Sequence, residues 1–140
     1  MKRSREEEDN YSALLDFFTL VNQSPEAVQA IGSKLDTRAS LQLTAVLGFV
    51  ADWDTFTQSR GKNAYFYRRA HDGRFQWLQW DSDLAFGNRS RGSFYGGSDA
   101  FVRWMEQPEQ QAAFRDMLDQ LVSLTSGSKS RVEAWMAQEA

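Results

Sequence analysis

Two runs of strand-forming residues flank a single turn in the middle of the chain, and this arrangement limits the fold more than any other feature. The runs are Ala64-Tyr65-Phe66-Tyr67-Arg68 and Arg74-Phe75-Gln76-Trp77-Leu78-Gln79-Trp80, and His71-Asp72-Gly73 separates them. Aromatic residues favour strands, and Asp-Gly favours the turn between paired strands. The sequence therefore predicts a β-hairpin, in which Trp77 and Trp80 point to opposite faces because side chains alternate along a strand.

Helical patterns lie on both sides of the predicted hairpin, where apolar residues recur at a spacing of three or four. Helix starts are predicted near Tyr11, Ser24-Pro25-Glu26, Asp36-Thr37 and Asp99, with a break at Pro108 and a last short helix after Ser126-Gly127-Ser128. The helix from Asp36 is expected to run to Asp52. Helices, one hairpin and further helices make an α+β fold that is mostly helical.

The composition limits both the number of domains and the classes of function. A chain of 140 residues normally forms one domain, here expected over residues 11–140 after a charged, disordered lead-in of residues 1–10. Sixteen basic and nineteen acidic residues give a net charge of −3, which argues against a dedicated nucleic-acid binder. The absence of cysteine excludes thiolate metal sites, thiol nucleophiles and disulfides. We expect neither a membrane span nor a signal peptide, and the compartment stays undetermined.

Acidic residues gather at two predicted element ends. Asp52 and Asp54 close a helix, while Asp81 and Asp83 leave the second strand of the hairpin. If strand geometry persists beyond Trp80, Asp81 and Asp83 point to the same side, where two carboxylates suit Mg²⁺ or Mn²⁺. The Asp-x-Asp spacing alone is weak evidence for a metal site, and by itself it favours a pair of solvated acids in a turn. Acids at a helix C-terminus oppose the macrodipole, which favours a functional role for Asp52 and Asp54.

Other polar residues near these acids have two interpretations each. Asn63, just before the first strand, offers a neutral oxygen ligand for a metal, or it satisfies a local backbone donor. Arg89 and Arg91 follow the second strand and are candidates to bind a phosphate or an acidic peptide, or they are solvated. His71, the one histidine, lies in the hairpin turn and is predicted to be a surface residue rather than a general base. Trp77 and Trp80 are predicted to be core residues, as is Trp53.

Three segments, taken in order, resemble the CotH kinase family. They are Asp52-Trp53-Asp54, Asn63-Ala64-Tyr65-Phe66-Tyr67-Arg68 and Trp80-Asp81-Ser82-Asp83-Leu84-Ala85-Phe86-Gly87. The family's pattern is approximately an Asn-Trp-Asp segment, an Asn-Tyr-Tyr-Leu-Tyr strand and a Pro-Trp-Asp-Leu-Asp segment that leads to Phe-Gly. The stretch from Trp104 to Pro108 and the pair Phe114-Arg115 are similar to the helical part that follows. The resemblance covers about residues 12 to 138.

The resemblance implies a function and assigns roles to residues. CotH proteins are atypical protein kinases, known from bacterial spore coats, that transfer the γ-phosphoryl group of ATP to a protein hydroxyl with Mg²⁺ (or Mn²⁺). By matching positions, Asp54 is the catalytic aspartate, Asn63 a metal-side asparagine, Asp81 the Mg²⁺-holding aspartate and Asp83 the second acid of the motif. Arg89 and Arg91 are then candidates to bind the ATP phosphates, and the partner is a protein substrate, for example a coat or envelope protein.

Departures from the family pattern keep other functions open. The proline before Trp-Asp is Gln79 here, and Asp54 and Asn63 lie nine positions apart rather than the five of ordinary kinases. The sequence lacks a glycine-rich loop and a strand with a phosphate-binding lysine, so it resembles the C-terminal lobe of the kinase fold, and we expect this chain alone to be inactive. The alternatives are a catalytically inactive interaction or scaffold module and another Asp-x-Asp enzyme, such as a nucleotide-sugar transferase.

Overall fold

The computed structural model of the chain describes residues 11–22, 27–58, 62–86, 95 and 99–126. Within these residues the elements are, in chain order, α1 (Ser12–Asn22), α2 (Ala27–Lys34), α3 (Thr37–Phe49), β1 (Ala64–Arg68), β2 (Phe75–Gln79), α4 (Asp99–Met105) and α5 (Pro108–Ser126). The predicted α+β fold with one hairpin is confirmed. The predicted lead-in of residues 1–10, the helix start at Ser24-Pro25-Glu26 and the last helix lie outside the described residues.

The strands β1 and β2 pair antiparallel, with Ala64 opposite Gln79 and Arg68 opposite Phe75. The inner face of this hairpin faces the helices, and Trp77 is only 1% exposed there. The outer face carries four large side chains that are all about half exposed, namely Tyr65, Tyr67, Leu78 and Trp80. The prediction that Trp80 is a core residue is therefore wrong: the alternation of the strand turns it outward, and the structure describes no element that covers this face.

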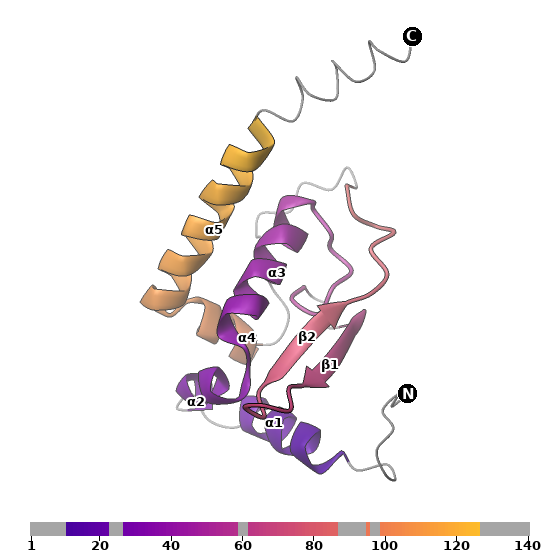
Figure 1. Cartoon of the computed structure of the whole chain (residues 1–140), viewed down its shortest axis with the longest axis vertical. Helices are drawn as coiled ribbons and strands as arrows, with labels where there is room; N and C mark the ends of the chain where they lie inside the picture. The colour runs from indigo at the N-terminus through magenta and orange to yellow at the C-terminus, as the bar shows by residue number, and fades with distance from the viewer. Residues whose placement is uncertain (1–10, 23–26, 59–61, 87–94, 96–98, 127–140) are drawn as a thin grey trace.

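Helix α3 lies at the centre of the fold, between α5 on one side and the hairpin on the other (Figure 1). Its residues Ser40, Leu41, Thr44, Ala45 and Leu47 are buried. The small side chains at Ser40 and Ala45, both 0% exposed, let neighbouring elements approach closely. Helices α1, α2 and α4 pack together near the N-terminal end of α3, so the core extends from the hairpin into a helical layer.

An aromatic cluster joins the hairpin to the helices. Phe66 from β1 lies against Phe17 and Phe18 of α1, with ring centroids 6.0 and 5.3 Å apart. Phe17 also contacts Phe75 of β2 at 5.3 Å. Each such pair contributes about 0.5–1.5 kcal/mol beyond the area it buries, because tilted and edge-on rings match positive edges to negative faces. The hairpin is therefore held by its inner face, since two strands alone are marginally stable in water.

The turn of the hairpin is tied to the start of α3. Asp36 is the N-cap of α3 and accepts a hydrogen bond from the amide of Ala39 at 3.2 Å, while its own amide donates to Phe75 O at 2.7 Å. The Arg69 guanidinium forms ion pairs with both Asp36 and Asp72. The hydrogen bond from Arg69 lowers the pKa of the Asp72 carboxyl below its ordinary value, although partial desolvation acts in the opposite direction. His71 is 75% exposed in this turn, as predicted.

Substitution of Trp77 by alanine should destabilise the fold by about 3–5 kcal/mol, because it removes a large buried side chain and leaves a cavity. The matched control is Trp80→Ala, which truncates a side chain that is 53% exposed on the outer face of the same hairpin. Urea unfolding followed by circular dichroism measures both. Equal losses of stability in the two variants would contradict the assignment of inner and outer faces.

The lowered pKa of Asp72 predicts how the stability of the folded protein changes at acid pH. Because the pKa is lower in the folded state than in the unfolded chain, the stabilisation is present above the ordinary pKa and is lost as the pH falls through the folded-state value. Asp72→Asn should therefore flatten the decrease in melting temperature between about pH 5 and pH 2. Asp119→Asn, on an exposed position of α5, is the control and should keep the wild-type slope.

Candidate functional site

The end of α3 places the first pair of acids. Helix α3 ends at Phe49 and not at Asp52, which corrects the prediction from the sequence. Ala51 adopts a positive φ of 55°, its amide donates to Gly48 O at 3.1 Å, and the amide of Asp52 donates to Leu47 O at 2.9 Å. This pair of bonds is a Schellman motif, which reverses the chain at a helix C-terminus and satisfies the last carbonyls. The chain therefore turns back toward the hairpin just before Asp52.

The segment after α3 is a buried loop. Asp52 and Asp54 are 2% and 5% exposed, and Asp52 Oδ1 accepts a hydrogen bond from the Asp54 amide at 3.3 Å. The hydroxyls of Thr55 and Thr57 bond to each other at 3.1 Å. Phe56 inserts its ring between the hairpin and α4. Its ring centroid lies 5.1 Å from that of Phe66, 5.6 Å from that of Trp77 and 6.1 Å from that of Phe101. This insertion anchors the loop that carries Asp54.

Two polar residues of this loop are buried, since Thr57 and Gln58 are 1% and 8% exposed. The aromatic anchor at Phe56 accounts for their burial, because it draws the residues that follow it into the protein. Trp53, predicted to be a core residue, is half-buried.

Asn63 connects this loop to the hairpin. Its Nδ2 donates to the backbone oxygen of Asp54 at 2.8 Å and to Asp54 Oδ2 at 3.2 Å. The same carboxylate oxygen lies 2.9 Å from Lys62 Nζ. Asp54 and Asn63 thus meet directly although nine positions separate them. No hydrogen bond to the amide oxygen of Asn63 appears within the part of the chain that the structure describes.

The backbone of Asn63 is also bonded to the residue before Asp81. The Trp80 amide donates to Asn63 O at 3.1 Å, which continues the ladder one pair beyond Ala64 and Gln79. Asp81 follows Trp80 directly. Strand β2 ends at Gln79, however, and Asp81 has a φ of 61°. Strand geometry therefore does not continue through Asp81 and Asp83, and the condition for the two side chains to share one side is not met.

Asp83 lies in a turn beyond this point. Ala85 N donates to Ser82 O at 3.1 Å, and both Asp81 and Asp83 are exposed. The Phe86 amide then donates to Val50 O at 2.6 Å, which ties the end of this segment to the C-terminus of α3. The segment that holds Asp81 and Asp83 is thus held at both ends, next to the loop that holds Asp52 and Asp54.

Backbone strain is concentrated around this site. Among the residues that the structure describes, four other than glycine have a positive φ, and they are Ala51, Asn63, Asp81 and Phe86. Asn and Asp tolerate the left-handed region better than other residues, whereas Ala and Phe adopt it at a cost of about 1–2 kcal/mol. All four flank the segments described above. Strained residues of this kind collect at functional sites, where the surrounding structure holds them.

The donors at this site suit a divalent cation that is shared with phosphate. In the described part of the chain no three His, Cys, Asp or Glu side chains gather into a metal-binding group. Mg²⁺ does not need such a group, because it commonly takes one or two protein oxygens together with substrate phosphates and water. The amide oxygen of Asn63 and the exposed carboxylate of Asp81 provide hard oxygens. Asp52 Oδ2 is buried without a hydrogen-bond partner among the described residues, which adds an unsatisfied acceptor nearby.

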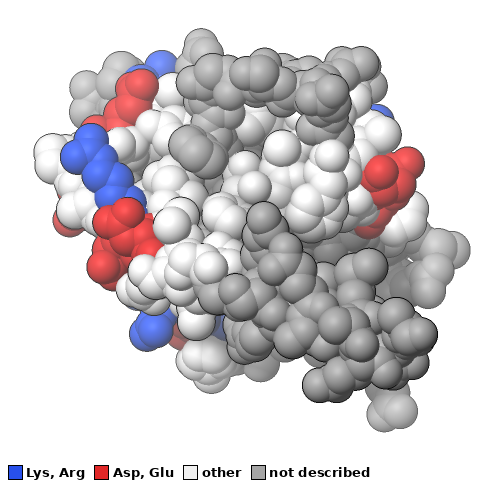
Figure 2. Space-filling view, turned by 90° about the horizontal axis from the view of Figure 1, so that it is seen from above, with Lys and Arg blue, Asp and Glu red and all other residues white. Residues whose placement is uncertain are grey.

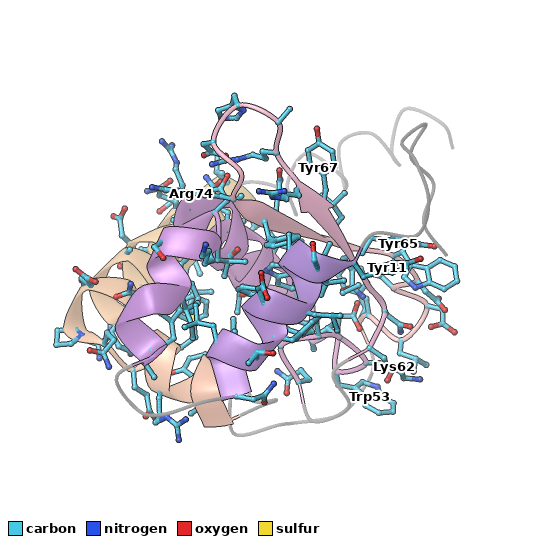
Figure 3. The ribbon with its side chains drawn as sticks, turned by 90° about the horizontal axis from the view of Figure 1, so that it is seen from below. Tyr11, Trp53, Lys62, Tyr65, Tyr67 and Arg74 are labelled. Carbon is cyan, nitrogen blue, oxygen red and sulfur yellow. The ribbon has the colours of Figure 1, made fainter. Side chains whose placement is uncertain are left out.

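Lys62 is the site residue that the sequence interpretation missed. It forms an ion pair with Asp54, one of the two acids that follow α3, and so places a cation beside that carboxylate. The signal was its place immediately before Asn63, at the start of the strand block. Figure 3 shows Lys62 and Trp53 on the same side of the molecule as Tyr65, away from Arg74. Arg89 and Arg91, the predicted phosphate ligands, lie outside the described residues.

In Figure 2 acidic and basic side chains lie next to one another along one edge of the face, with a further acidic group at the opposite edge, and no broad basic patch appears among the coloured residues. A cavity of about 630 Å³ lies elsewhere, between α2, α3, α4 and α5, and contains none of the predicted site residues. None of the helices that the structure describes is both long enough and apolar enough to cross a membrane.

Comparison with known proteins identifies the family. The family model described as CotH kinase protein matches residues 1–134, which is nearly the whole chain. No curated protein and no solved structure matches this chain. The matched region includes the three segments that hold Asp54, Asn63 and Asp81. The chain therefore belongs to the CotH kinase family.

Proposed function

We propose that this chain carries the metal-binding and phosphoryl-transfer part of a protein kinase site, in a fold that corresponds to the C-terminal lobe of a kinase. The substrate pair is Mg-ATP (or Mn-ATP) and a protein hydroxyl. One observation carries the proposal: Asn63, at the open end of the hairpin, donates to Asp54 and is bonded through its backbone to Trp80, the residue before Asp81. These are the residue types that phosphoryl transfer requires, namely an acid for the hydroxyl and two oxygen donors for the metal.

Each residue has a distinct role in this proposal. Asp54 accepts or orients the proton of the attacking hydroxyl, since its carboxylate is held by Asn63 and Lys62. The Asn63 amide oxygen and the Asp81 carboxylate hold the metal ion. When bound, the ion neutralises the charge of the phosphates. Asp83 is proposed as an outer acid of the same site, and Arg89 and Arg91 as contacts to phosphate, on the basis of family resemblance.

A second candidate is a catalytically inactive interaction module. The observation in its favour is the outer face of the hairpin, where Tyr65, Tyr67, Leu78 and Trp80 are 43–53% exposed. Adjacent exposed apolar side chains of this kind mark protein interaction sites. The two candidates differ in their requirement for nucleotide. A coat or envelope protein is the proposed partner in either case, as substrate in the first and as scaffold partner in the second.

Titration of the chain with Mg-ATP by calorimetry separates the two candidates. Under the kinase proposal, wild-type protein binds Mg-ATP at millimolar concentration or below, and Asp81→Asn weakens binding about 10- to 100-fold by removing a metal ligand. Asp119→Asn on α5 is the matched control and should bind as wild type does. Absence of heat for the wild-type chain at millimolar Mg-ATP would favour the interaction module instead.

Transfer itself is tested in the complete gene product, with ³²P from ATP measured on protein. Asp54→Asn should reduce incorporation about 10²- to 10⁴-fold, because the amide cannot take the hydroxyl proton. The same variant should keep its affinity for Mg-ATP within a few-fold, since Asp54 is not proposed as a metal ligand. Wild-type incorporation in Asp54→Asn would contradict the role of this residue as the base.

A further inference from the structure

The ion pair between Lys62 and Asp54 has an unusual distribution of burial. Lys62 Nζ lies 2.9 Å from Asp54 Oδ2, while the side chains are 48% and 7% exposed. The carboxylate is therefore held inside the protein, and the ammonium approaches it from the solvent side. Lysine is a compact charge on a flexible stem with three donors that rotate freely. One donor contacts Asp54, which leaves the other two able to reach a second anion on the solvent side.

Loss of the ion pair would leave Asp54 in place. Asn63 independently holds Asp54 through bonds to its backbone oxygen at 2.8 Å and to Oδ2 at 3.2 Å. The Asp52 carboxylate also accepts a bond from the Asp54 amide. The ion pair is worth more than the roughly 0–1 kcal/mol of a pair between two exposed side chains, because the Asp54 carboxylate is nearly buried. The exposed position of the ammonium has a further consequence for electrostatics, since it offsets the charge of that carboxylate on the solvent side.

Lys62 also lies where a phosphate group would approach. It directly precedes Asn63, whose backbone oxygen accepts a hydrogen bond from the amide of Trp80, the residue before Asp81. Lys62 is therefore next in sequence to one proposed metal ligand and in contact with the proposed base. A phosphate placed against these acids without a cation would be repelled by the Asp54 carboxylate. Among the described residues Lys62 is the basic side chain seen in contact with Asp54.

From this geometry we propose that Lys62 is a phosphate-contacting residue, which bridges the Asp54 carboxylate and the transferred phosphoryl group. The inference rests on the proposed function and adds a residue to it. In the free protein Lys62 screens Asp54. When Mg-ATP binds, the ammonium keeps its contact with Asp54 and donates a second hydrogen bond to a γ-phosphate oxygen. Negative charge on that oxygen must be stabilised during transfer.

Lys62 takes no part in the bonds that form and break during transfer. The hydroxyl oxygen of the protein substrate forms a bond to the γ-phosphorus, and the bond from that phosphorus to the β–γ bridging oxygen breaks. ADP leaves with the electron pair of the broken bond, and the hydroxyl proton passes to Asp54. Lys62 keeps its own protons throughout and acts only through its charge and its hydrogen bonds.

The test uses the polyphosphate part of the ligand alone. Calorimetry with inorganic tripolyphosphate and Mg²⁺ removes any contribution of the adenine base. Lys62→Met, which keeps most of the side-chain length and removes the charge, should weaken binding about 10-fold or more. Lys62→Arg, which keeps the charge, should retain affinity within about 3-fold. Lys34→Met, which removes an exposed lysine in the last turn of α2, is the matched control and should bind as wild type does.

Thermal unfolding separates a phosphate contact from a structural role. Lys62→Arg keeps a cation beside the buried Asp54 carboxylate and should keep the wild-type melting temperature. Binding by Lys62→Met is measured well below its own melting temperature, so that a loss of affinity reports the phosphate contact and not unfolding. If Lys62→Met binds Mg-tripolyphosphate as tightly as wild type while Mg-ATP binding is intact, the role of Lys62 is overturned and the proposed function stands. If wild-type protein binds neither Mg-ATP nor Mg-tripolyphosphate, both proposals are overturned.

Discussion

The packing of Phe56 is the interaction on which the rest of the site depends. This ring leaves the loop after α3 and contacts Phe66 and Trp77 on the hairpin and Phe101 on α4. A loop would otherwise lie on the surface, because its polar backbone needs water. Here the aromatic contacts hold the residues from Asp52 to Gln58 inside the protein. The position of the Asp54 carboxylate is thus a consequence of hydrophobic packing two residues further along the chain.

The hairpin has two separate functions in the molecule. Its inner face supplies Phe66, Phe75 and Trp77 to the core, and those contacts stabilise a sheet of only two strands. Its open end, where Asn63 pairs with Trp80, joins the loop after α3 to the segment of Asp81. The site therefore lies at a junction of rigid elements. Rigid support of this kind is what positions donors and acceptors for chemistry.

Charge at the site is arranged around one buried carboxylate. Asp54 is enclosed, and its neighbours Asn63 and Lys62 both donate to the same oxygen, one as a neutral amide and the other as a cation. Asp81, by contrast, is exposed at the mouth of the site. An inner acid with restricted access and an outer acid open to solvent can act on different partners. The first suits proton transfer and the second suits a hydrated metal ion.

Local sequence determined most of the elements of this protein. The alternation of aromatic residues around Asp72-Gly73 predicted the hairpin and its two faces. Asp36 marked a helix start and Pro108 a break between two helices, and the structure has both. These predictions succeed because strand alternation, helix capping and turn formation depend on neighbours within a few residues. The order of Asp54, Asn63 and Asp81 in the sequence also indicated the family before any geometry was known.

Tertiary structure alone decided how the site is assembled. The burial of Thr57 and Gln58 follows from the packing of Phe56 against the hairpin and α4, which are far away in the chain. Tertiary packing also decided which face of the hairpin meets the helices, and thus that Trp77 is buried and Trp80 exposed. The same is true of the ion pair from Lys62 to Asp54, which spans eight positions. Residue patterns report the preferences of short segments, whereas burial and charge pairing depend on what packs against each segment, and the sequence does not state that directly.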